Sequence, residues 1–272
     1  MRNKHPSSPA FNSQLCTTSP FTECTFTQSD SISLSSSSSF TSCSFVSLTS
    51  DDNGGAIYFT SKTSLKVSKC FFDSCTANAK FGGAIYAKSV SIIEVYVSLF
   101  TQCKCLNSLN NDGGGAILIA AITNKPSVSN CDFICCYSKE DGVAIDIQHS
   151  TAPTQNSNTI TSCRFFSNSA LNGYANVGGA ICIWENSPVP GLTDCLLSRS
   201  TSMSYGGALY VHFKMSTKHV IRFCMFVDND CQANNGNEAY FDGSPNEPFF
   251  YCFSFKTGSP RIGPSNNDNW LP

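Results

Sequence analysis

Sixteen cysteines and four histidines are the side chains of this 272-residue sequence that could act as nucleophiles or soft metal ligands. The closest cysteine pairs, Cys103-x-Cys105 and Cys135-Cys136, lack the paired CxxC spacing and the histidine partners of zinc sites. A catalytic thiol needs a base beside it, and no histidine stands in a recognisable motif. The histidines are His5, His149, His212 and His219. We therefore expect no metal, no cofactor and no catalytic thiol.

Two other groups of residues could carry a function. Asp141, Asp146 and His149 fall in one short stretch, and clustered acids perform the general acid–base chemistry of polysaccharide cleavage. A set of ring side chains would suit sugars or partner surfaces if they were exposed together. These residues are Tyr58, Tyr86, Trp184, Tyr210 and His212. Which group matters depends on the elements that position it.

A repeat dominates the chain. Gly-Gly-Ala followed by an aliphatic residue occurs five times, and a degraded copy fills the one gap in the series. The copies begin at Gly54, Gly82, Gly114, Gly178 and Gly206, and the degraded one is Gly142-Val143-Ala144-Ile145. Their alanines are 28, 32, 28, 36 and 28 residues apart. A period of about 30 residues is typical of solenoids and related repeat folds.

A cysteine marker runs in step with this repeat. Its positions are Cys24, Cys43, Cys70, Cys103, Cys131, Cys163, Cys195, Cys224 and Cys252. Phe usually follows two residues later, at Phe26, Phe45, Phe72, Phe133, Phe165 and Phe226. Because residues two apart share one face of a strand, we expect Cys70, Cys103, Cys131, Cys163, Cys195 and Cys224 to form a single internal column beside these phenylalanines.

Alternating patterns predict short strands throughout. Ile57 and Phe59, like Ile117 and Ile119, are apolar around a freely varying residue, and no stretch has a helical period. Three short strands and three turns per unit, each unit stacking on the next, predict an all-β, right-handed parallel β-helix of about eight to nine coils. We assign it to residues 21–256, with an irregular segment over 1–20 and an irregular tail over 257–272.

The repeats resemble those of the chlamydial polymorphic outer membrane proteins and their Cys-rich relatives in parasitic protists. Gly-Gly-Ala-Ile is one motif, and Phe-x-x-Asn occurs as Phe165-Phe166-Ser167-Asn168 and Phe226-Val227-Asp228-Asn229. Phe72-Asp73-Ser74-Cys75 and Phe133-Ile134-Cys135-Cys136 carry Cys in place of Asn. The resemblance covers roughly residues 20 to 255 and implies a right-handed β-helix at a cell surface with a role in adhesion.

Stacked repeats also allow the candidate residues to be weighed. The positions equivalent to Asp146 in neighbouring units are Leu118 and Cys182, which supply no second acid, so we interpret Asp141, Asp146 and His149 as solvated residues. The aromatic column is either an exposed ligand-binding face or a surface covered by a loop or terminal segment. The ladder cysteines could form disulfides between adjacent coils, but packed thiols are favoured because bridges would pull in-register strands out of pleat.

Composition narrows the partners. With 17 basic and 19 acidic residues the formal charge is −2, which lacks the basic surface that nucleic-acid binding uses. The first twenty residues have no apolar run typical of a secretory signal, and the longest apolar stretch, Ala116 to Ile122, is too short to span a bilayer. Localisation stays open between the cell surface, which the resemblance implies, and the cell interior.

We therefore expect a non-enzymatic surface or interaction protein, with glycans or proteins as partners. The alternatives are a polysaccharide-active β-helix enzyme and a fragment of a larger surface protein without independent activity. Open strand edges at a solenoid end recruit other chains, so we also expect the ends to fray or self-associate. The serine-rich run Ser31 to Ser39 predicts that the N-terminal coil is the least regular.

Overall fold

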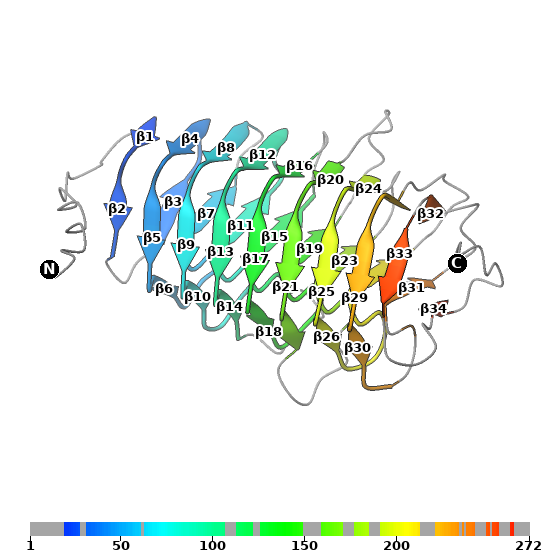
Figure 1. Cartoon of the computed structure of the whole chain (residues 1–272). Coiled ribbons are helices and arrows are strands. Elements are labelled where there is room, and N and C mark those ends of the chain that lie inside the picture. Colours follow the sequence, from blue (N-terminus) through cyan, green and yellow to red (C-terminus); the bar gives the residue numbers. More distant parts are fainter. Residues whose placement is uncertain are drawn as a thin grey trace, which may run out of the picture.

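The computed structural model describes residues 19–27, 31–60, 63–106, 113–121, 126–148, 159–170, 177–184, 191–212, 221–233, 236, 238–242, 249–250, 252–255 and 262–263. Over these ranges the chain is all-β and winds into a parallel β-solenoid, its coils stacked along one axis from the N-terminal to the C-terminal end (Figure 1). The predicted fold class is confirmed.

Four parallel sheets, here named A to D, form the walls of the solenoid, and a full coil passes through them in the order A, B, D, C. Sheet A contains β1 (Phe21–Thr22), β4 (Ser38–Thr41), β8 (Ser64–Ser68), β12 (Ile92–Tyr96), β16 (Pro126–Ser129), β20 (Thr159–Thr161), β24 (Gly191–Thr193), β28 (Ile221–Arg222) and β32 (Phe249–Phe250). Sheet B contains β2 (Thr25–Phe26), β5 (Ser44–Val46), β9 (Phe71–Asp73), β13 (Leu99–Thr101), β17 (Asp132–Ile134), β21 (Arg164–Phe166), β25 (Leu196–Ser198), β29 (Met225–Val227) and β33 (Phe253–Phe255).

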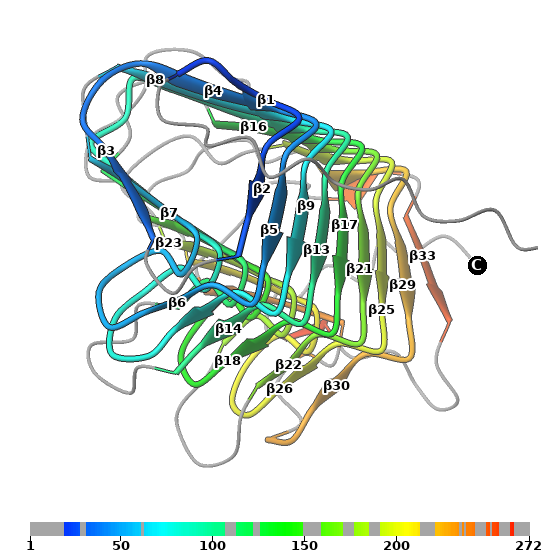
Figure 2. The same cartoon turned by 90° about the vertical axis from the view of Figure 1, so that its left-hand side faces the viewer.

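Sheets C and D complete each coil. Sheet C contains β3 (Ile32–Leu34), β7 (Ile57–Thr60), β11 (Ile85–Lys88), β15 (Ile117–Ala120), β19 (Ile145–Gln148), β23 (Ile181–Trp184), β27 (Leu209–His212), β31 (Ala239–Asp242) and β34 (Ile262–Gly263). Sheet D contains β6 (Thr49–Ser50), β10 (Thr76–Ala77), β14 (Lys104–Cys105), β18 (Tyr137–Ser138), β22 (Ser169–Ala170), β26 (Thr201–Ser202) and β30 (Asp230–Cys231). Viewed along the axis, sheets A, B and C enclose the core, and sheet D projects from the corner between B and C (Figure 2).

Neighbouring coils pair in register, so equivalent residues of the repeat lie side by side. Ile85 lies between Ile57 and Ile117 in sheet C, and the same column continues through Ile145 to Ile181. The apolar residues of this column are fully buried, and the residues between them face outward. Period-two patterning therefore predicted the faces of sheet C correctly.

The sequence predicted three strands per coil, and the strands of sheet D are the ones it did not predict. Each of them is only two residues long, which is too short to show a period of two. The Gly-Gly pair makes room for sheet D. Gly54 has a φ of +67°, which bends the chain into sheet C, whereas a Cβ on Gly55 would lie 2.6 Å from the backbone nitrogen of Thr76 in β10. The first glycine of the motif therefore makes the corner, and the second lets sheet D approach the backbone closely.

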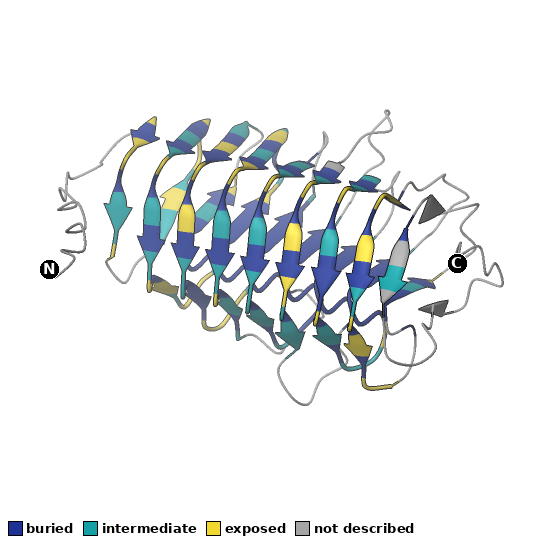
Figure 3. Ribbon diagram, viewed as in Figure 1, coloured by how far each residue is buried: buried dark blue, intermediate teal, exposed yellow. Residues whose placement is uncertain are grey.

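Phenyl rings stack along the inside of sheet B. Phe45, Phe72, Phe100, Phe133 and Phe165 are fully buried, and successive ring centroids are 4.4, 4.6, 4.8 and 4.9 Å apart with planes within 5° of parallel. These inward positions form the dark-blue band of sheet B in Figure 3. Offset stacking of this kind adds to the free energy gained from burial alone.

The predicted cysteine column is wrong at one member. In register, Ser98 lies between Cys70 and Cys131, because Leu99 pairs with both Phe71 and Asp132. Ser98 Oγ accepts a hydrogen bond from the backbone N–H of Cys70 at 3.1 Å and donates to the carbonyl of Tyr96 at 3.0 Å. Ser98, and not Cys103, is therefore the member of this column between Cys70 and Cys131. The remaining ladder cysteines do form one internal column along the corner between sheets A and B.

A second inward column follows the phenyl stack, at the Asn position of Phe-x-x-Asn. Asn168 is fully buried and joins two coils: its Oδ1 accepts from the backbone N–H of Cys136 at 3.0 Å, and its Nδ2 donates to the carbonyl of Phe133 at 3.1 Å. Asn229 makes the equivalent pair of bonds to the coil before it, both at 2.9 Å. The motif therefore works as a clamp between successive coils.

Cysteines take the clamp position in three coils, and Cys103 is one of them. Each thiol lies within hydrogen-bond distance of the carbonyl that the Asn side chain would reach, the phenylalanine carbonyl of the preceding coil, and also of the carbonyl two residues earlier in its own coil. The pairs are Cys75 with Phe45 at 3.5 Å, Cys103 with Phe72 at 3.8 Å and Cys136 with Phe100 at 3.8 Å. Cys thus replaces the donor half of the clamp but has no acceptor oxygen for the backbone N–H.

The ends differ in part from expectation. Ile262 and Gly263, in the tail predicted to be irregular, pair with Ala239 and Tyr240 of sheet C. The N-terminal segment 1–18 and residues 264–272 lie outside the described residues. In the parts of the chain that the structure describes, no helix has the length and apolar character of a membrane span.

The clamp gives a stability prediction. Asn168→Ala should lower the free energy of unfolding by about 2–3 kcal/mol, because it leaves a buried N–H and a buried carbonyl without partners. Cys103→Asn should raise it by about 1 kcal/mol by completing a clamp. Urea unfolding followed by circular dichroism measures both, with the exposed Asn78→Ala as a control expected within about 0.5 kcal/mol of wild type. Equal effects of Asn168→Ala and Asn78→Ala would contradict the clamp.

Candidate functional site

The ring side chains singled out in the sequence all lie on the outer face of sheet C, in two adjacent columns. Tyr58, Tyr86 and Tyr210 belong to the first column, which also contains Leu118, Asp146 and Cys182. Trp184 and His212 belong to the second column, which Gln148 and Asp242 continue. The connections from sheet D to sheet C run beside this face, below sheet C in Figure 2. The structure therefore confirms the shared face but not its uniform exposure.

Two of the residues predicted to face a ligand are buried, contrary to the expectation of an exposed aromatic column. Tyr86 and Tyr210 are only 7% and 5% exposed. Phe81, from the connection between sheets D and C, packs with Tyr86 and Leu118 in a small apolar cluster. A loop covers this part of the aromatic column, which is the alternative that the sequence left open.

The acids proposed for catalysis are not solvated residues either. Asp141 and Asp146 are 1% and 0% exposed. Asp141 Oδ1 accepts from the backbone N–H of Val177, and Asp146 Oδ2 accepts from the backbone N–H of Gly113, each at 3.0 Å. Both carboxylates thus hold backbone at the entry to sheet C, beyond the reach of a polysaccharide. His149, the third member of that candidate group, lies outside the described residues, as do His5 and His219.

Near the C-terminal end of the face, one carboxylate and five ring side chains lie together, and we call this group the Asp242 shelf. Its members are Trp184, Tyr205, Tyr210, His212, Tyr240 and Asp242. Asp242 Oδ2 lies 2.8 Å from His212 Nδ1 and accepts a hydrogen bond from the Tyr210 hydroxyl at 3.3 Å. One carboxylate therefore fixes an imidazole and a phenol side by side.

The rings of the shelf pack against one another in a continuous layer. Tyr240 stacks on Tyr210 with centroids 5.8 Å apart and meets Tyr205 at 4.5 Å. Trp184 contacts Tyr210 at 5.3 Å and His212 at 5.5 Å. Tyr210 is the buried centre, whereas Tyr205 is 36% exposed and Trp184 and Tyr240 are half-buried. The shelf presents ring surfaces to solvent beside a half-exposed carboxylate.

Three members of the shelf escaped the sequence analysis. Tyr240 and Asp242 lie in register with Tyr210 and His212, but their coil begins Gly236-Asn237-Glu238 in place of Gly-Gly-Ala. The φ of +70° at Gly236 still marks the corner, so a search for the single glycine could have found them. Tyr205 lies before sheet C, at an isolated bridge to Val177 that no sequence period indicates.

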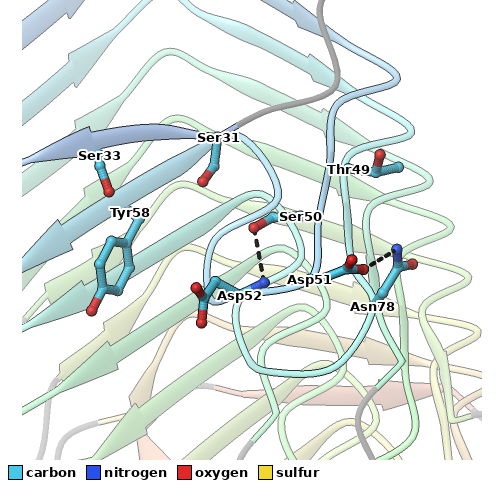
Figure 4. Close-up of a pocket in the computed structure, with 8 residues that line it drawn as sticks. All are labelled: Ser31, Ser33, Thr49, Ser50, Asp51, Asp52, Tyr58 and Asn78. Atoms are coloured by element: carbon cyan, nitrogen blue, oxygen red, sulfur yellow. Dashed lines mark hydrogen bonds between the residues drawn. The ribbon is translucent and has the colours of Figure 1, made fainter.

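At the N-terminal end of the same face, Tyr58 lines a hollow of about 560 Å³. The rest of its lining is polar: Ser31, Ser33, Thr49, Ser50, Asp51, Asp52 and Asn78. Figure 4 shows the tyrosine ring on one side and Asp51 with Asn78 on the other. This hollow and the Asp242 shelf are the two candidate sites on the face.

The described cysteines are mostly buried, and the pKa values of their thiols shift in both directions. Hydrogen bonds from neighbouring ladder cysteines lower the pKa of Cys163 and of Cys224. Burial raises the pKa of Cys103 well above its ordinary value, and the pKa of Cys182 is raised by burial and by the nearby charges of Asp146 and Asp141. Of the nine ladder positions, eight carry thiols in the structure, as the sequence favoured, and Cys24 is the disulfide-bonded exception. Among the described residues, no three His, Cys, Asp or Glu side chains group as a metal site would.

Comparisons with protein-family models, with curated proteins and with solved structures find no match to this chain.

The Asp242 shelf gives a prediction for alkaline pH. Burial, and then the negative charge of Asp242, raise the pKa of the Tyr210 phenol above its ordinary value of about 10. In Asp242→Asn the tyrosinate absorbance of Tyr210 should therefore appear at lower pH, and Tyr210→Phe should remove it. Since the folded pKa exceeds the unfolded one, the contribution of Tyr210 to stability is complete below about pH 10 and is lost as the pH rises further. An unchanged titration in Asp242→Asn would contradict the contact.

Proposed function

We propose that this chain is a non-enzymatic surface or interaction protein that binds glycans through the Asp242 shelf. The observation that carries the proposal is the convergence of exposed ring surfaces and a half-exposed carboxylate–imidazole pair at one place on a rigid sheet. The binding residues Trp184, Tyr205 and Tyr240 would offer ring faces, and Asp242 and His212 would offer polar contacts.

Sugar chemistry suits this arrangement. A pyranose has an apolar face of C–H groups and an equatorial rim of hydroxyls, so it needs a ring to lie on and acceptors at the edge. Half-buried Tyr and Trp rings supply large contact area at little cost in side-chain entropy. Asp242 is 51% exposed at its side chain and keeps acceptor capacity beyond His212 and Tyr210. A hydroxyl-bearing ligand could therefore bond to a carboxylate that is already held in position.

The repeat motifs add support for a surface role. Their resemblance to the polymorphic outer membrane proteins favours adhesion at a cell surface, with host or cell-surface glycans or proteins as partners. Self-association through the solenoid ends stays a prediction, because most residues beyond β1 and β33 lie outside the described ranges. A role as part of a larger surface protein is compatible with the same site.

The enzyme alternative has one observation in its favour, the His212–Asp242 pair, in which a carboxylate orients an imidazole as in many general bases. Glycoside cleavage usually takes two carboxylates about 5–10 Å apart. Among the described residues the shelf offers Asp242 alone at the surface, since Asp141 and Asp146 are buried. Binding is therefore the better supported function.

Glycan-array screening followed by titration calorimetry with the strongest ligand tests the proposal. Tyr205→Ala and Asp242→Asn should each weaken binding about tenfold or more, because one removes ring contact and the other a charge-assisted acceptor. Tyr96→Ala, at an exposed tyrosine on sheet A, is the matched control and should bind like wild type. Failure of the array, or equal loss in all three variants, would refute a sugar site at the shelf. Release of shortened chains from the bound polysaccharide would favour the enzyme.

A further inference from the structure

The hollow at the N-terminal end exists because of a change in side-chain size along one column. Ser33, Tyr58 and Tyr86 are in register on the outer face of sheet C. One coil further on, Phe81 covers the column by packing against Tyr86 and Leu118. Ser33 is too small to fill the corresponding space, so a cavity of about 560 Å³ opens over Tyr58, a size within the range of small-molecule sites.

The lining has a particular polar inventory. Four hydroxyls, those of Ser31, Ser33, Thr49 and Ser50, face it together with two carboxylates and one amide. Ser50 Oγ is already held by the backbone N–H of Asp52 at 3.0 Å. Hydroxyls of this kind can donate to or accept from the hydroxyls of a sugar.

The two carboxylates are not equivalent. Asp52 forms an ion pair with Lys80, which neutralises it. Asp51 Oδ1 accepts from the Asn78 amide at 3.1 Å, and within the described ranges no Lys, Arg or His forms an ion pair with it. The Asn78 amide carries no charge, so it does not neutralise Asp51 as Lys80 neutralises Asp52. The hollow therefore combines an aromatic ring, several hydroxyls and one carboxylate whose charge is not balanced (Figure 4).

We propose that this hollow is a second ligand site that binds an amine-bearing sugar, with the sugar ring on Tyr58 and the protonated amine at Asp51. The ring face of Tyr58 suits the apolar face of the sugar, and the serine and threonine hydroxyls suit its hydroxyls. A protonated amine donates three hydrogen bonds to acceptors, which is the charge-assisted contact that Asp51 can make. The site shares no residue with the Asp242 shelf and lies at the other end of sheet C.

Titration calorimetry with a β-1,4-linked glucosamine disaccharide and with its N-acetylated form tests the site. Measurements at about pH 6 keep the sugar amine protonated. Wild-type protein should bind the free amine about tenfold or more tightly than the acetylated form, since acetylation removes a charge-assisted bond. Added salt should reduce this preference, because the contact is partly exposed.

Matched variants separate the contacts. Asp51→Asn should bind both disaccharides alike, whereas Asp52→Asn, at the carboxylate paired with Lys80, should keep most of the preference. Asp242→Asn should leave the preference for the free amine in place whatever it does to sugar binding at the shelf, so failure of this site is distinguishable from failure of the proposed glycan site. All lie at exposed positions, and equal melting temperatures confirm folding. Absence of saturable binding, or a preference that survives in Asp51→Asn, would overturn the proposal.

Discussion

In-register parallel pairing between successive coils is the constraint on which the rest of this molecule depends. Because each residue lies beside its equivalent in the next coil, at a spacing of about 4.8 Å, a side chain fits only if its neighbours in the column also fit. Phenylalanine satisfies this inside sheet B by stacking ring on ring. The same rule makes the outer face of sheet C a set of columns, so that a change of residue in one coil creates a local site: Ser33 opens a hollow, and Asp242 organises a shelf.

Corners are where the pairing needs help from particular side chains. At both bends around sheet B a residue other than glycine takes a positive φ, as at Lys69 and Ser74, which is strained backbone for such residues. In many coils the residue after such a bend is buried and bonds across coils, as Asn168 does with two bonds and Cys75 with one. We infer that these inward side chains offset the strain of the bends, which explains why small polar or thiol side chains recur there while the bend residues vary freely.

The sequence predicted the regular columns of this structure and missed the places where a column changes. Gly-Gly-Ala and the cysteine marker sufficed for the fold and for the faces of sheet C. Cys103 was misplaced because Ser98 interrupts its column, and a serine carries no marker in a serine-rich chain. The burial of Asp141 and Asp146 could not be predicted, since their partners, Val177 and Gly113, are more than thirty residues away. Sites that arise where a column changes are the least periodic part of a repeat, so half of the Asp242 shelf was missed.

Sulfur positions in a crystal test the register most directly, because eleven of the sixteen cysteines lie in two inward columns, eight in the ladder and three at the clamp position. A long-wavelength anomalous difference map should show two rows of sulfur with a spacing of about 4.8 Å along each row. We expect Cys103 in the same row as Cys75 and Cys136, and a gap at Ser98 between Cys70 and Cys131. A Cys103 sulfur lying between those of Cys70 and Cys131 would contradict the register. Sulfur atoms that do not form rows of even spacing would contradict the parallel solenoid.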